Sequence, residues 1–248
     1  VTNIKAAKNQ VETENGVFSY DYLVIATGAI TNYFGNDSIQ EKSFSMKSTL
    51  EALQIRNTFL QHLEEAAFFK TTKSEEKLSV VIVGGGPTGV ELSGALAEMK
   101  RDSLPSEYPE IDFSKMKIYL LEGSPKLLAS MSEASSIKSK KYLEDMGVIV
   151  KTNTIVEQYN GTKVLLKDKS EIESAFVIWT AGVKGNAPAG LGSTIITPSG
   201  QIKTDIYNRV ISTEKNIFAV GDIAHVESKL YPKGFPQLAS VSIDHTTP

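Results

Sequence analysis

The sequence lacks cysteine altogether and has little histidine. Its 248 residues include no Cys, and the three histidines, His62, His225 and His245, lie far apart. Without thiols, the chain cannot form a disulfide, a thiolate metal site, an iron–sulfur cluster or a Cys-x-x-Cys redox centre. Because the histidines are scattered, a zinc site is not expected either, and no metal site is predicted.

An excess of charge and long apolar segments are also missing. The formal net charge is only −3, with 26 Lys and Arg against 29 Asp and Glu. This balance gives no electrostatic reason to expect binding to nucleic acid or to an anionic membrane surface. No apolar run is long enough to cross a bilayer, and the first residues show no signal-peptide pattern. The content of 41% hydrophobic and 22% charged residues is ordinary for a soluble globular protein of one large or two modest domains.

The first thirty residues predict strands. Residues 11–14 and 17–20 flank Asn15-Gly16, which predicts a hairpin with a type I′ turn. Residues 23–26 are continuously apolar and lead into Thr27-Gly28. A buried strand that ends in small residues suits the close approach of a ligand or of another backbone.

A linker and a long helix are expected next. Residues 31–47 are interpreted as a linker. From Ser48, apolar residues recur at helical spacing, and Ser48 and Glu51 match a capping box at the start of the helix. The apolar positions are Leu50, Leu53, Phe59, Leu60 and Leu63. The helix is predicted to cover 48–68, with His62 on its surface.

Strands and helices then alternate, which predicts an α/β fold. The expected strands cover 80–83, 117–122, 148–152, 163–168, 175–182 and 216–220, and the expected helices 87–100 and 132–145. Residues 102–116, with Pro105 and Pro109, are predicted to be irregular. Asn160-Gly161 indicates a second hairpin, and Trp179 is assigned to the core.

A glycine-rich turn joins the strand at 80–83 to the helix that begins at Pro87. Gly84, Gly86 and Gly89 follow the pattern G-x-G-x-x-G. In such a turn the first glycine allows a tight bend, the second lets the backbone approach a pyrophosphate, and the third lets the helix pack closely on the strand. The helix N-terminus offers N–H groups and positive partial charge to the phosphates. The turn predicts a dinucleotide site; the alternative is a strand–helix turn with chance glycines.

Three acidic residues are candidates for contacts with a bound nucleotide or another ligand. Glu122 ends the strand at 117–122, where a carboxylate can accept from both ribose hydroxyls and repel a 2′-phosphate, so it predicts a preference for NADH over NADPH; the alternative is an exposed acid at a strand end. Its gap from Gly84 is longer than usual, because the irregular segment lies between them. Glu91, early in the helix from Pro87, either lies beside a nicotinamide or is a carboxylate stabilised by the helix dipole. Asp222 follows Gly221 at the end of a buried strand, where open α/β sheets bind ligands.

The motifs together resemble a known flavoprotein family. Their order is "ATGA" at 26–29, G-x-G-x-x-G at 84–89, "WTAGV" at 179–183 and "AVGD" at 219–222. This order resembles the flavoprotein oxidoreductases with two dinucleotide-binding domains, related to the pyridine nucleotide-disulfide oxidoreductases. "VVIVGGGPTGVELSGALAEM", "EYPEIDF", "IYLLEGSPKLL" and "VIWTAGVKG" narrow the resemblance to the type II NADH:quinone oxidoreductases, the single-subunit NADH dehydrogenases of the respiratory chain.

The resemblance implies a Rossmann-like NAD-binding domain at 36–182, inserted in an incomplete FAD-binding domain at 1–35 and 183–248. NADH would pass a hydride to FAD, and electrons would continue to a quinone. The implied NADH contacts are Gly84, Gly85, Gly86, Pro87, Thr88, Gly89, Glu122, Ala181, Gly182 and Val183, with Glu91 as the implied catalytic residue. The implied FAD contacts are Thr27, Gly28, Gly221 and Asp222.

Two departures from the family pattern shape the expectations. No G-x-G-x-x-G precedes Tyr20, and no amphipathic membrane-binding helices follow the last motif. The chain, which starts at Val1, is therefore expected to be the middle of a longer enzyme, to bind NADH and to oxidise it negligibly by itself. "FPQLASVSID" at 235–244 resembles the quinone-side segment, but Ser240 and Asp244 stand where the family typically has glutamines.

The resemblance also implies a location and partners. The full-length protein would lie on the cytoplasmic face of a membrane as a peripheral protein, with a homodimer as one option and no nucleic-acid partner. Two other functions stay open: a non-catalytic NAD-binding redox sensor, and a soluble NADH-dependent reductase of an iron–sulfur electron carrier.

Overall fold

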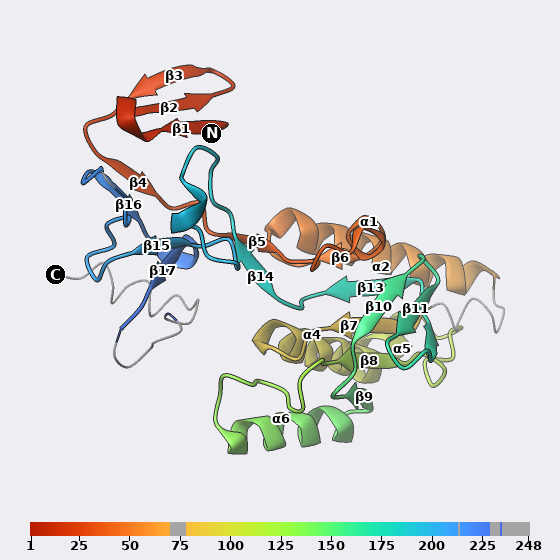
Figure 1. Cartoon of the computed structure of the whole chain (residues 1–248). Helices are drawn as coiled ribbons and strands as arrows, with labels where there is room; N and C mark the ends of the chain where they lie inside the picture. The colour runs from red at the N-terminus through yellow and green to blue at the C-terminus, as the bar shows by residue number, and fades with distance from the viewer. Residues whose placement is uncertain (70–77, 213, 229–233, 235–248) are drawn as a thin grey trace. The chain divides into compact units, whose positions relative to one another are not determined.

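The chain divides into two compact units. The computed structural model describes residues 1–69, 78–212, 214–228 and 234. Unit 1 comprises Val1–Ile30 and Val183–Pro248, and unit 2 comprises Thr31–Gly182 (Figure 1). The assignment of a cofactor to each unit remains a prediction.

Unit 2 is built around a five-stranded parallel sheet. Its strand order is β6 (Phe44–Ser45), β13 (Phe176–Trp179), β7 (Val80–Val83), β8 (Ile118–Leu121) and β9 (Val148–Lys151). Every residue of β7 and β13 is buried. Continuous apolar runs are expected in parallel strands because both faces of the sheet are covered.

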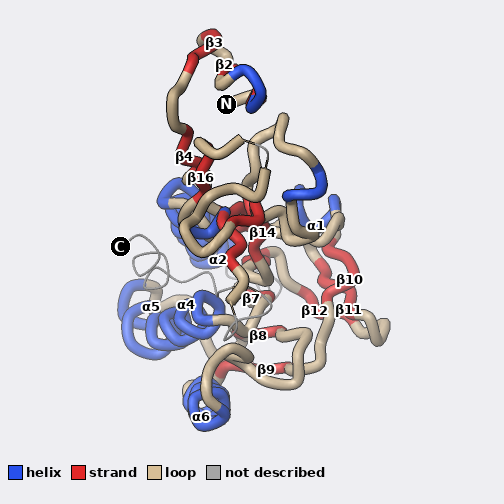
Figure 2. Tube along the Cα trace, turned by 60° about the vertical axis from the view of Figure 1, so that its left-hand side comes forward, coloured by secondary structure: helices blue, strands red, loops and turns tan. Residues whose placement is uncertain are grey.

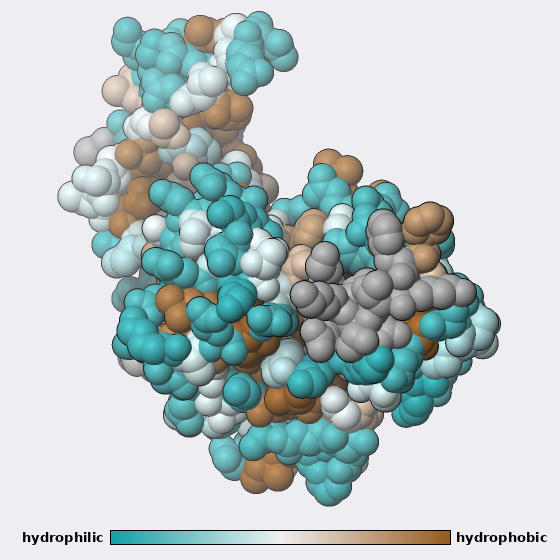
Figure 3. Space-filling view, turned by 90° about the vertical axis from the view of Figure 1, so that its right-hand side faces the viewer, coloured by the Kyte–Doolittle hydropathy of each residue, from teal (hydrophilic) through white to brown (hydrophobic). Residues whose placement is uncertain are grey.

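Helices cover one face of this sheet. They are α2 (Thr49–Phe69), α4 (Pro87–Glu98), α5 (Leu104–Glu107) and α6 (Glu133–Asp145), and their buried side chains share one core with the sheet. Figure 2 shows α4 and α5 on the side of β7 and β8 opposite to β10–β12. The outer surface is mostly hydrophilic on the face that Figure 3 shows.

A three-stranded antiparallel sheet covers the other face. β10 (Val156–Tyr159), β11 (Lys163–Leu166) and β12 (Glu171–Glu173) form this meander, with Asn160-Gly161 in the predicted hairpin. The meander carries the chain from β9 to β13, so strands replace the helix of an ordinary crossover. Its apolar side chains pack on the parallel sheet together with Ile39.

The expected linker at 31–47 is wrong, because this segment belongs to unit 2. It contains α1 (Asp37–Lys42) and the edge strand β6. The Asn36 side chain caps α1 by accepting from the Ile39 N–H at 3.2 Å, which satisfies an N–H that has no partner within the helix. Ile39 is 1% exposed and is the buried residue that holds α1 against the rest of unit 2. The helix has only six residues, too few to show a helical pattern of apolar positions in the sequence.

The capping box of α2 is confirmed. The Glu51 N–H donates to Ser48 Oγ at 3.2 Å, and the Ser48 N–H donates to Glu51 Oε2 at 2.7 Å. Leu50 and Leu53 are exposed, contrary to the predicted apolar face, which shifts to Ile55, Phe59, Leu63 and Ala66. His62 is half-buried rather than on the surface, because its ring meets the edge of Phe176.

The predicted irregular segment is partly helical. The helix of α4 continues through a π-helical turn, Met99–Ser103, into α5. Pro105 lies in the first turn of α5, where proline is tolerated because its missing N–H has no intrahelical role.

Unit 1 consists of short strands and 3₁₀ turns. Its strands are β1 (Asn3–Lys5), β2 (Gln10–Thr13), β3 (Gly16–Ser19), β4 (Leu23–Ile25), β5 (Ala29–Thr31, ending at the first residue of unit 2), β14 (Val183–Gly185), β15 (Ile202–Thr204), β16 (Ile217–Ala219) and β17 (Ala224–Val226). Its 3₁₀ turns are Ala6–Lys8, Ser193–Ile195 and Gly221–Ile223. A core around Ile4, Ile25, Ile202 and Ile217 holds the unit together.

The first hairpin forms, but its predicted turn is wrong. β2 pairs with β3 so that Thr13 lies opposite Gly16, and Glu14 and Asn15 form the loop. Asn15 has no positive φ, which a type I′ turn would require. Instead, Thr13 Oγ1 accepts from the Asn15 N–H at 3.1 Å, a local side-chain bond that competes with the type I′ geometry.

Candidate functional site

The glycine turn lies at the carboxyl end of β7 and is packed on both sides. Gly84 has φ +116°, and a Cβ there would lie 2.7 Å from the Ala181 backbone nitrogen. A Cβ on Gly89 would lie 1.9 Å from the Gly84 carbonyl oxygen. Both positions therefore require glycine for the fold itself, since α4 approaches the end of β7 this closely.

Gly86 differs from its neighbours, because a Cβ there would meet no atom within 4 Å. The residue forms the N-cap of α4, and no side chain caps this helix end. Of the three glycines in the motif, only Gly86 has no packing reason to lack a side chain. An open backbone at an uncapped helix N-terminus is the arrangement that accepts a phosphate.

Glu122 supports the same turn from the neighbouring strand. One carboxylate oxygen accepts from the Gly85 N–H at 2.5 Å, and the other accepts from the Ser124 N–H at 2.7 Å. Each carboxylate oxygen has a second acceptor position, so these bonds leave the carboxylate able to accept from a ligand. The Gly85 carbonyl accepts from the Leu128 N–H at 2.8 Å, so Gly85 is fixed at both its polar groups.

Thr180 is a residue of the site that the sequence analysis missed. Its hydroxyl lies 3.0 Å from the Val83 carbonyl oxygen and 3.2 Å from that of Gly84, and donates toward both. It thereby ties the loop after β13 to the glycine turn. The sequence places Thr180 directly after a buried strand. Its contact with the glycine turn can be inferred only once β13 is known to lie next to β7.

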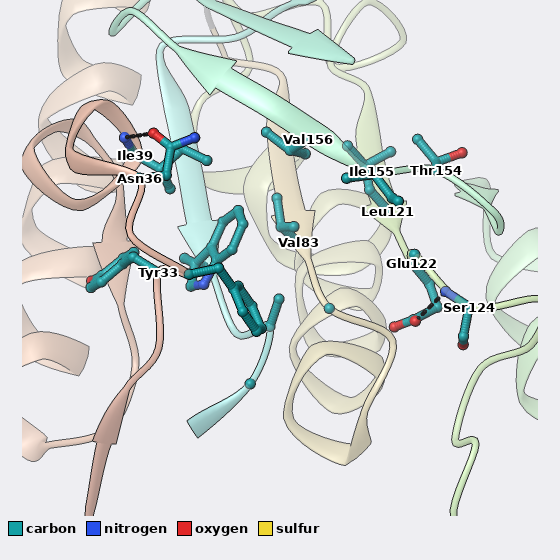
Figure 4. Close-up of a pocket in the computed structure, with 16 residues that line it drawn as sticks. Tyr33, Asn36, Ile39, Val83, Leu121, Glu122, Ser124, Thr154, Ile155 and Val156 are labelled. Carbon is teal, nitrogen blue, oxygen red and sulfur yellow. Dashed lines mark hydrogen bonds between the residues drawn. The ribbon is translucent and has the colours of Figure 1, made fainter. Parts of the chain in front are cut away.

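A cavity of about 550 Å³ lies beside the turn within unit 2 (Figure 4). Figure 4 shows Glu122 and Ser124 on one side of it and Tyr33 and Asn36 on the other, with Val83 between them. Its lining residues are Tyr33, Phe34, Asn36, Ile39, Val83, Gly84, Leu121, Glu122, Gly123, Ser124, Thr154, Ile155, Val156, Trp179, Ala181 and Gly182. The cavity is large enough for a substantial part of a dinucleotide.

Aromatic residues form one wall of this cavity, which the sequence analysis did not foresee. Trp179 is 5% exposed, as its assignment to the core predicts, and it also lines the cavity. Its indole N–H donates to the Asn32 carbonyl at 2.9 Å, and Tyr33 stacks on it with ring centroids 6.1 Å apart. The segment read as a linker therefore supplies part of the site.

Several predicted residues lie outside the cavity lining, including Gly85, Gly86 and Gly89 of the glycine turn. Glu91, Pro87 and Thr88 are exposed on α4. Ala181 and Gly182 line the cavity, whereas Val183 begins β14 in unit 1.

The residues predicted for FAD come together within unit 1. β4 and β16 are parallel neighbours, with Ile25 opposite Ala219, so the segments after both strands lie at the same sheet edge. Gly28 has φ +65° and Gly221 has φ +75°, and Asp222 follows Gly221. The Thr27 hydroxyl donates to the Asn186 carbonyl at 2.7 Å.

No cluster of three or more His, Asp or Glu side chains in the described part of the chain is placed to hold a metal. None of the described helices has the length and apolarity needed to cross a bilayer.

Unit 2 combines a parallel sheet, a glycine turn at the carboxyl edge and an acid on the adjacent strand, which defines a Rossmann-like dinucleotide-binding fold. The predicted α/β class is confirmed. The chain belongs to the pyridine nucleotide-disulphide oxidoreductase family, whose model matches residues 1–246.

Individual relatives agree with this assignment. The chain is 33% identical over 220 residues to the type II NADH:quinone oxidoreductase Ndh of Mycobacterium tuberculosis, a match that covers 84% of this chain and 47% of that protein. NDH2 from Plasmodium falciparum in complex with NADH is 28% identical, with a TM-score of 0.83 over 92% of this chain and 50% of that one. The chain spans about half the length of the curated relatives it matches.

More distant structures share the fold alone. A ferredoxin reductase from Rhodopseudomonas palustris has a TM-score of 0.71 at 18% identity and covers 94% of this chain and 52% of that one. The predicted resemblance to the type II enzymes is confirmed by the relatives from Mycobacterium tuberculosis and Plasmodium falciparum, at the level of sequence and fold.

Proposed function

We propose that this chain binds NADH and supplies the NADH-binding part of a flavin-dependent NADH:quinone oxidoreductase. The observation that carries the proposal is Gly86, which is open to a ligand at the uncapped start of α4 while Glu122 lies at the end of the next strand. The likeness to a structure of NDH2 in complex with NADH supports the choice of ligand.

Each part of the dinucleotide has a proposed partner. The glycine turn, Gly84–Gly89, would hold the pyrophosphate with its backbone N–H groups. Glu122 would accept from the adenosine ribose and disfavour a 2′-phosphate. Ala181, Gly182 and Val183 would lie near the nicotinamide through their backbone, and Glu91 would lie beside it.

A bound FAD would supply the chemistry of accepting a hydride and releasing electrons one at a time. Thr27, Gly28, Gly221 and Asp222 are the proposed FAD contacts, with the Asp222 carboxylate toward the ribityl hydroxyls. The fit is partial, because the described residues of unit 1 form no α-helix whose N-terminus could accept the flavin pyrophosphate. The role of these residues is to orient the polyol part of the cofactor.

Quinone is the proposed acceptor because the similar curated proteins carry that activity in their names. The segment predicted to meet it, 235–244, lies outside the described residues. A peripheral position on the cytoplasmic face of a membrane and a homodimer are part of the same proposal, supported by the resemblance of sequence. Sedimentation of the protein with quinone-containing vesicles would test the membrane association.

The soluble iron–sulfur reductase is the weaker alternative. The reductases of that kind share 18–19% identity with this chain, against 33–34% for the type II enzymes of Mycobacterium tuberculosis. A redox-sensing module would have the same proposed NADH site but would not oxidise NADH with flavin.

Calorimetric titration of the chain with NADH and with NADPH tests the central claim. Binding of NADH with clearly weaker binding of NADPH supports the proposal. Equal affinities would remove Glu122 from the site, and no binding of either would contradict the proposed function. NADH oxidation with FAD and a soluble quinone, measured on the full-length protein that contains this chain, then separates the enzyme from a sensor.

A further inference from the structure

The cavity contains an aromatic residue in a backbone conformation that is unusual for it. Phe34 has φ +53° and Gly35 has φ +75°. The Asn36 N–H donates to the Tyr33 carbonyl at 3.0 Å. Residues 33–36 therefore form a tight turn whose two central residues both have positive φ, as in a type I′ turn. Gly, Asn or Asp fills the first central position far more readily than a bulky side chain does.

Packing does not explain the choice of phenylalanine at this position. Phe34 is 69% exposed although its ring lines the cavity. The described contact of the ring is with Gly182, where an added Cβ would lie 2.9 Å from Phe34 Cζ. A strained conformation combined with an open apolar ring is typical of a ligand-binding position.

The turn that holds Phe34 is anchored on both sides. Asn32 Oδ1 accepts from the Phe34 N–H at 2.9 Å, and the Asn32 N–H donates to the Gly182 carbonyl at 3.2 Å. The Trp179 indole N–H donates to the Asn32 carbonyl. Beyond the turn, the Asn36 side-chain amide donates to the Glu157 carbonyl at 2.6 Å. These bonds preorganise the backbone of the turn that carries the ring before any ligand arrives.

We propose that Phe34 is a specificity-determining contact for the nicotinamide half of the dinucleotide, an inference that rests on the proposed NADH site. The ring lies against Gly182, in the loop that follows β13, whereas Glu122 directly follows β8. β7 and its glycine turn lie between these two strands. A dinucleotide with its pyrophosphate at the turn and its adenosine at Glu122 therefore directs its other half toward Phe34.

Substitution of Phe34 by Gly removes the ring and leaves the turn in its preferred conformation, because glycine accepts positive φ without strain. We expect Phe34→Gly to weaken NADH binding about 5- to 100-fold, the range for loss of an aromatic stacking partner. Binding of ADP-ribose, which lacks the nicotinamide, should stay unchanged. Phe34→Tyr keeps the ring and should bind NADH like the wild type. All three proteins are titrated with both ligands by calorimetry, and their melting temperatures are compared.

The two-ligand design separates the possible failures. Equal loss of NADH and ADP-ribose binding in Phe34→Gly would show a purely structural role, and unchanged binding of both would show no role; either result overturns this inference and leaves the NADH site standing. If the wild-type chain binds neither ligand, the proposed function fails and this inference fails with it. A selective loss of NADH binding that Phe34→Tyr does not share confirms it.

Discussion

At the scale of the residue, Gly86 is the position where we expect a substitution to affect NADH binding without affecting folding. A valine side chain there would project into open space, since no protein atom lies within 4 Å of the Cβ position. We expect Gly86→Val to fold normally and to lose NADH binding, because the branched side chain would occupy the proposed pyrophosphate position. Circular dichroism and calorimetric titration with NADH measure the two properties.

Gly94 offers a matched control on the same helix. A Cβ there would lie 3.8 Å from Leu143 Cδ2, which is ordinary contact. Gly94→Ala should stabilise the chain by up to about 1 kcal/mol through helix propensity and leave NADH binding intact. Normal NADH binding by Gly86→Val would instead show that the glycine turn does not contact the pyrophosphate.

Glu122 is predicted to contribute both charge and support for the turn. Glu122→Ala should weaken NADH binding by about 1–3 kcal/mol and narrow the preference over NADPH, because a charged acceptor is lost. Ser124→Ala is the control, since it keeps the backbone N–H that Glu122 accepts from and removes only a hydroxyl bonded to the Lys126 carbonyl. Parallel titrations with both nucleotides provide the measurement, and an unaltered nucleotide preference in Glu122→Ala would refute the assignment.

The site residues that the sequence could identify depend on local geometry, and those that it could not identify depend on contacts between distant segments of the chain. The requirement for glycine at Gly84 and Gly89 follows in part from local geometry, namely the positive φ of Gly84 and the approach of Gly89 to the Gly84 carbonyl oxygen, which a motif records directly. The role of Thr180 depends on β13 lying next to β7, a pairing between segments almost a hundred residues apart. The strain at Phe34 is likewise invisible until the turn at 33–36 is seen.

At the scale of the element, the cap of α2 links stability to pH. Burial raises the pKa of Glu51, but hydrogen bonds from Ser45, Lys47 and Ser48 outweigh it and hold the pKa below its ordinary value of 4.5. Because the folded-state pKa is depressed, the unfolded chain binds more protons, so this stabilisation is present above pH 4.5 and is lost as the pH falls through the folded value.

Glu51→Gln should therefore reduce the pH dependence of stability on the acidic side. The wild type is expected to be more stable than the variant near neutral pH by about 1 kcal/mol, because glutamine can still accept in the capping box but lacks the charge that strengthens these hydrogen bonds, and the difference should shrink in acid. Urea unfolding at several pH values measures it. A difference that stays constant from neutral to acidic pH would contradict the depressed pKa.

Elements with a clear apolar pattern were predictable and those without one were not. Continuous apolar runs identified the strands β7 and β8, and helical periodicity identified the longer helices α4 and α6. α1 and β6 escaped, since six and two residues cannot show such a pattern. Their positions come from tertiary contacts, such as the buried Ile39 and the pairing of β6 with β13.

At the scale of the whole molecule, the two units differ in how completely they can bind a cofactor. Unit 2 has the helix N-terminus, the turn and the acid that a dinucleotide needs. In the described residues of unit 1, a possible flavin contact consists of the segments after β4 and β16 alone. A few hydrogen bonds of about 0.5–1.5 kcal/mol each do not offset an association cost of at least ~4 kcal/mol.

The 248-residue chain is therefore expected to purify without flavin, to bind NADH, and to oxidise it negligibly. The visible absorbance spectrum of the purified chain is the measurement, with NADH titration as the control for a folded unit 2. A stoichiometric flavin band would show that unit 1 holds FAD by contacts other than those described.

The position of Trp179 makes the intrinsic tryptophan fluorescence of the protein a measure of what occupies the cavity. It is the sole tryptophan of the sequence, it lines the cavity, and its indole N–H is fixed to the Asn32 carbonyl. Tryptophan emission overlaps the absorption of reduced nicotinamide, so NADH in the cavity would quench it by energy transfer, whereas oxidised nucleotide or ADP-ribose would not quench it by this route. We therefore expect the protein's own fluorescence to distinguish reduced from oxidised ligand in the cavity without any label.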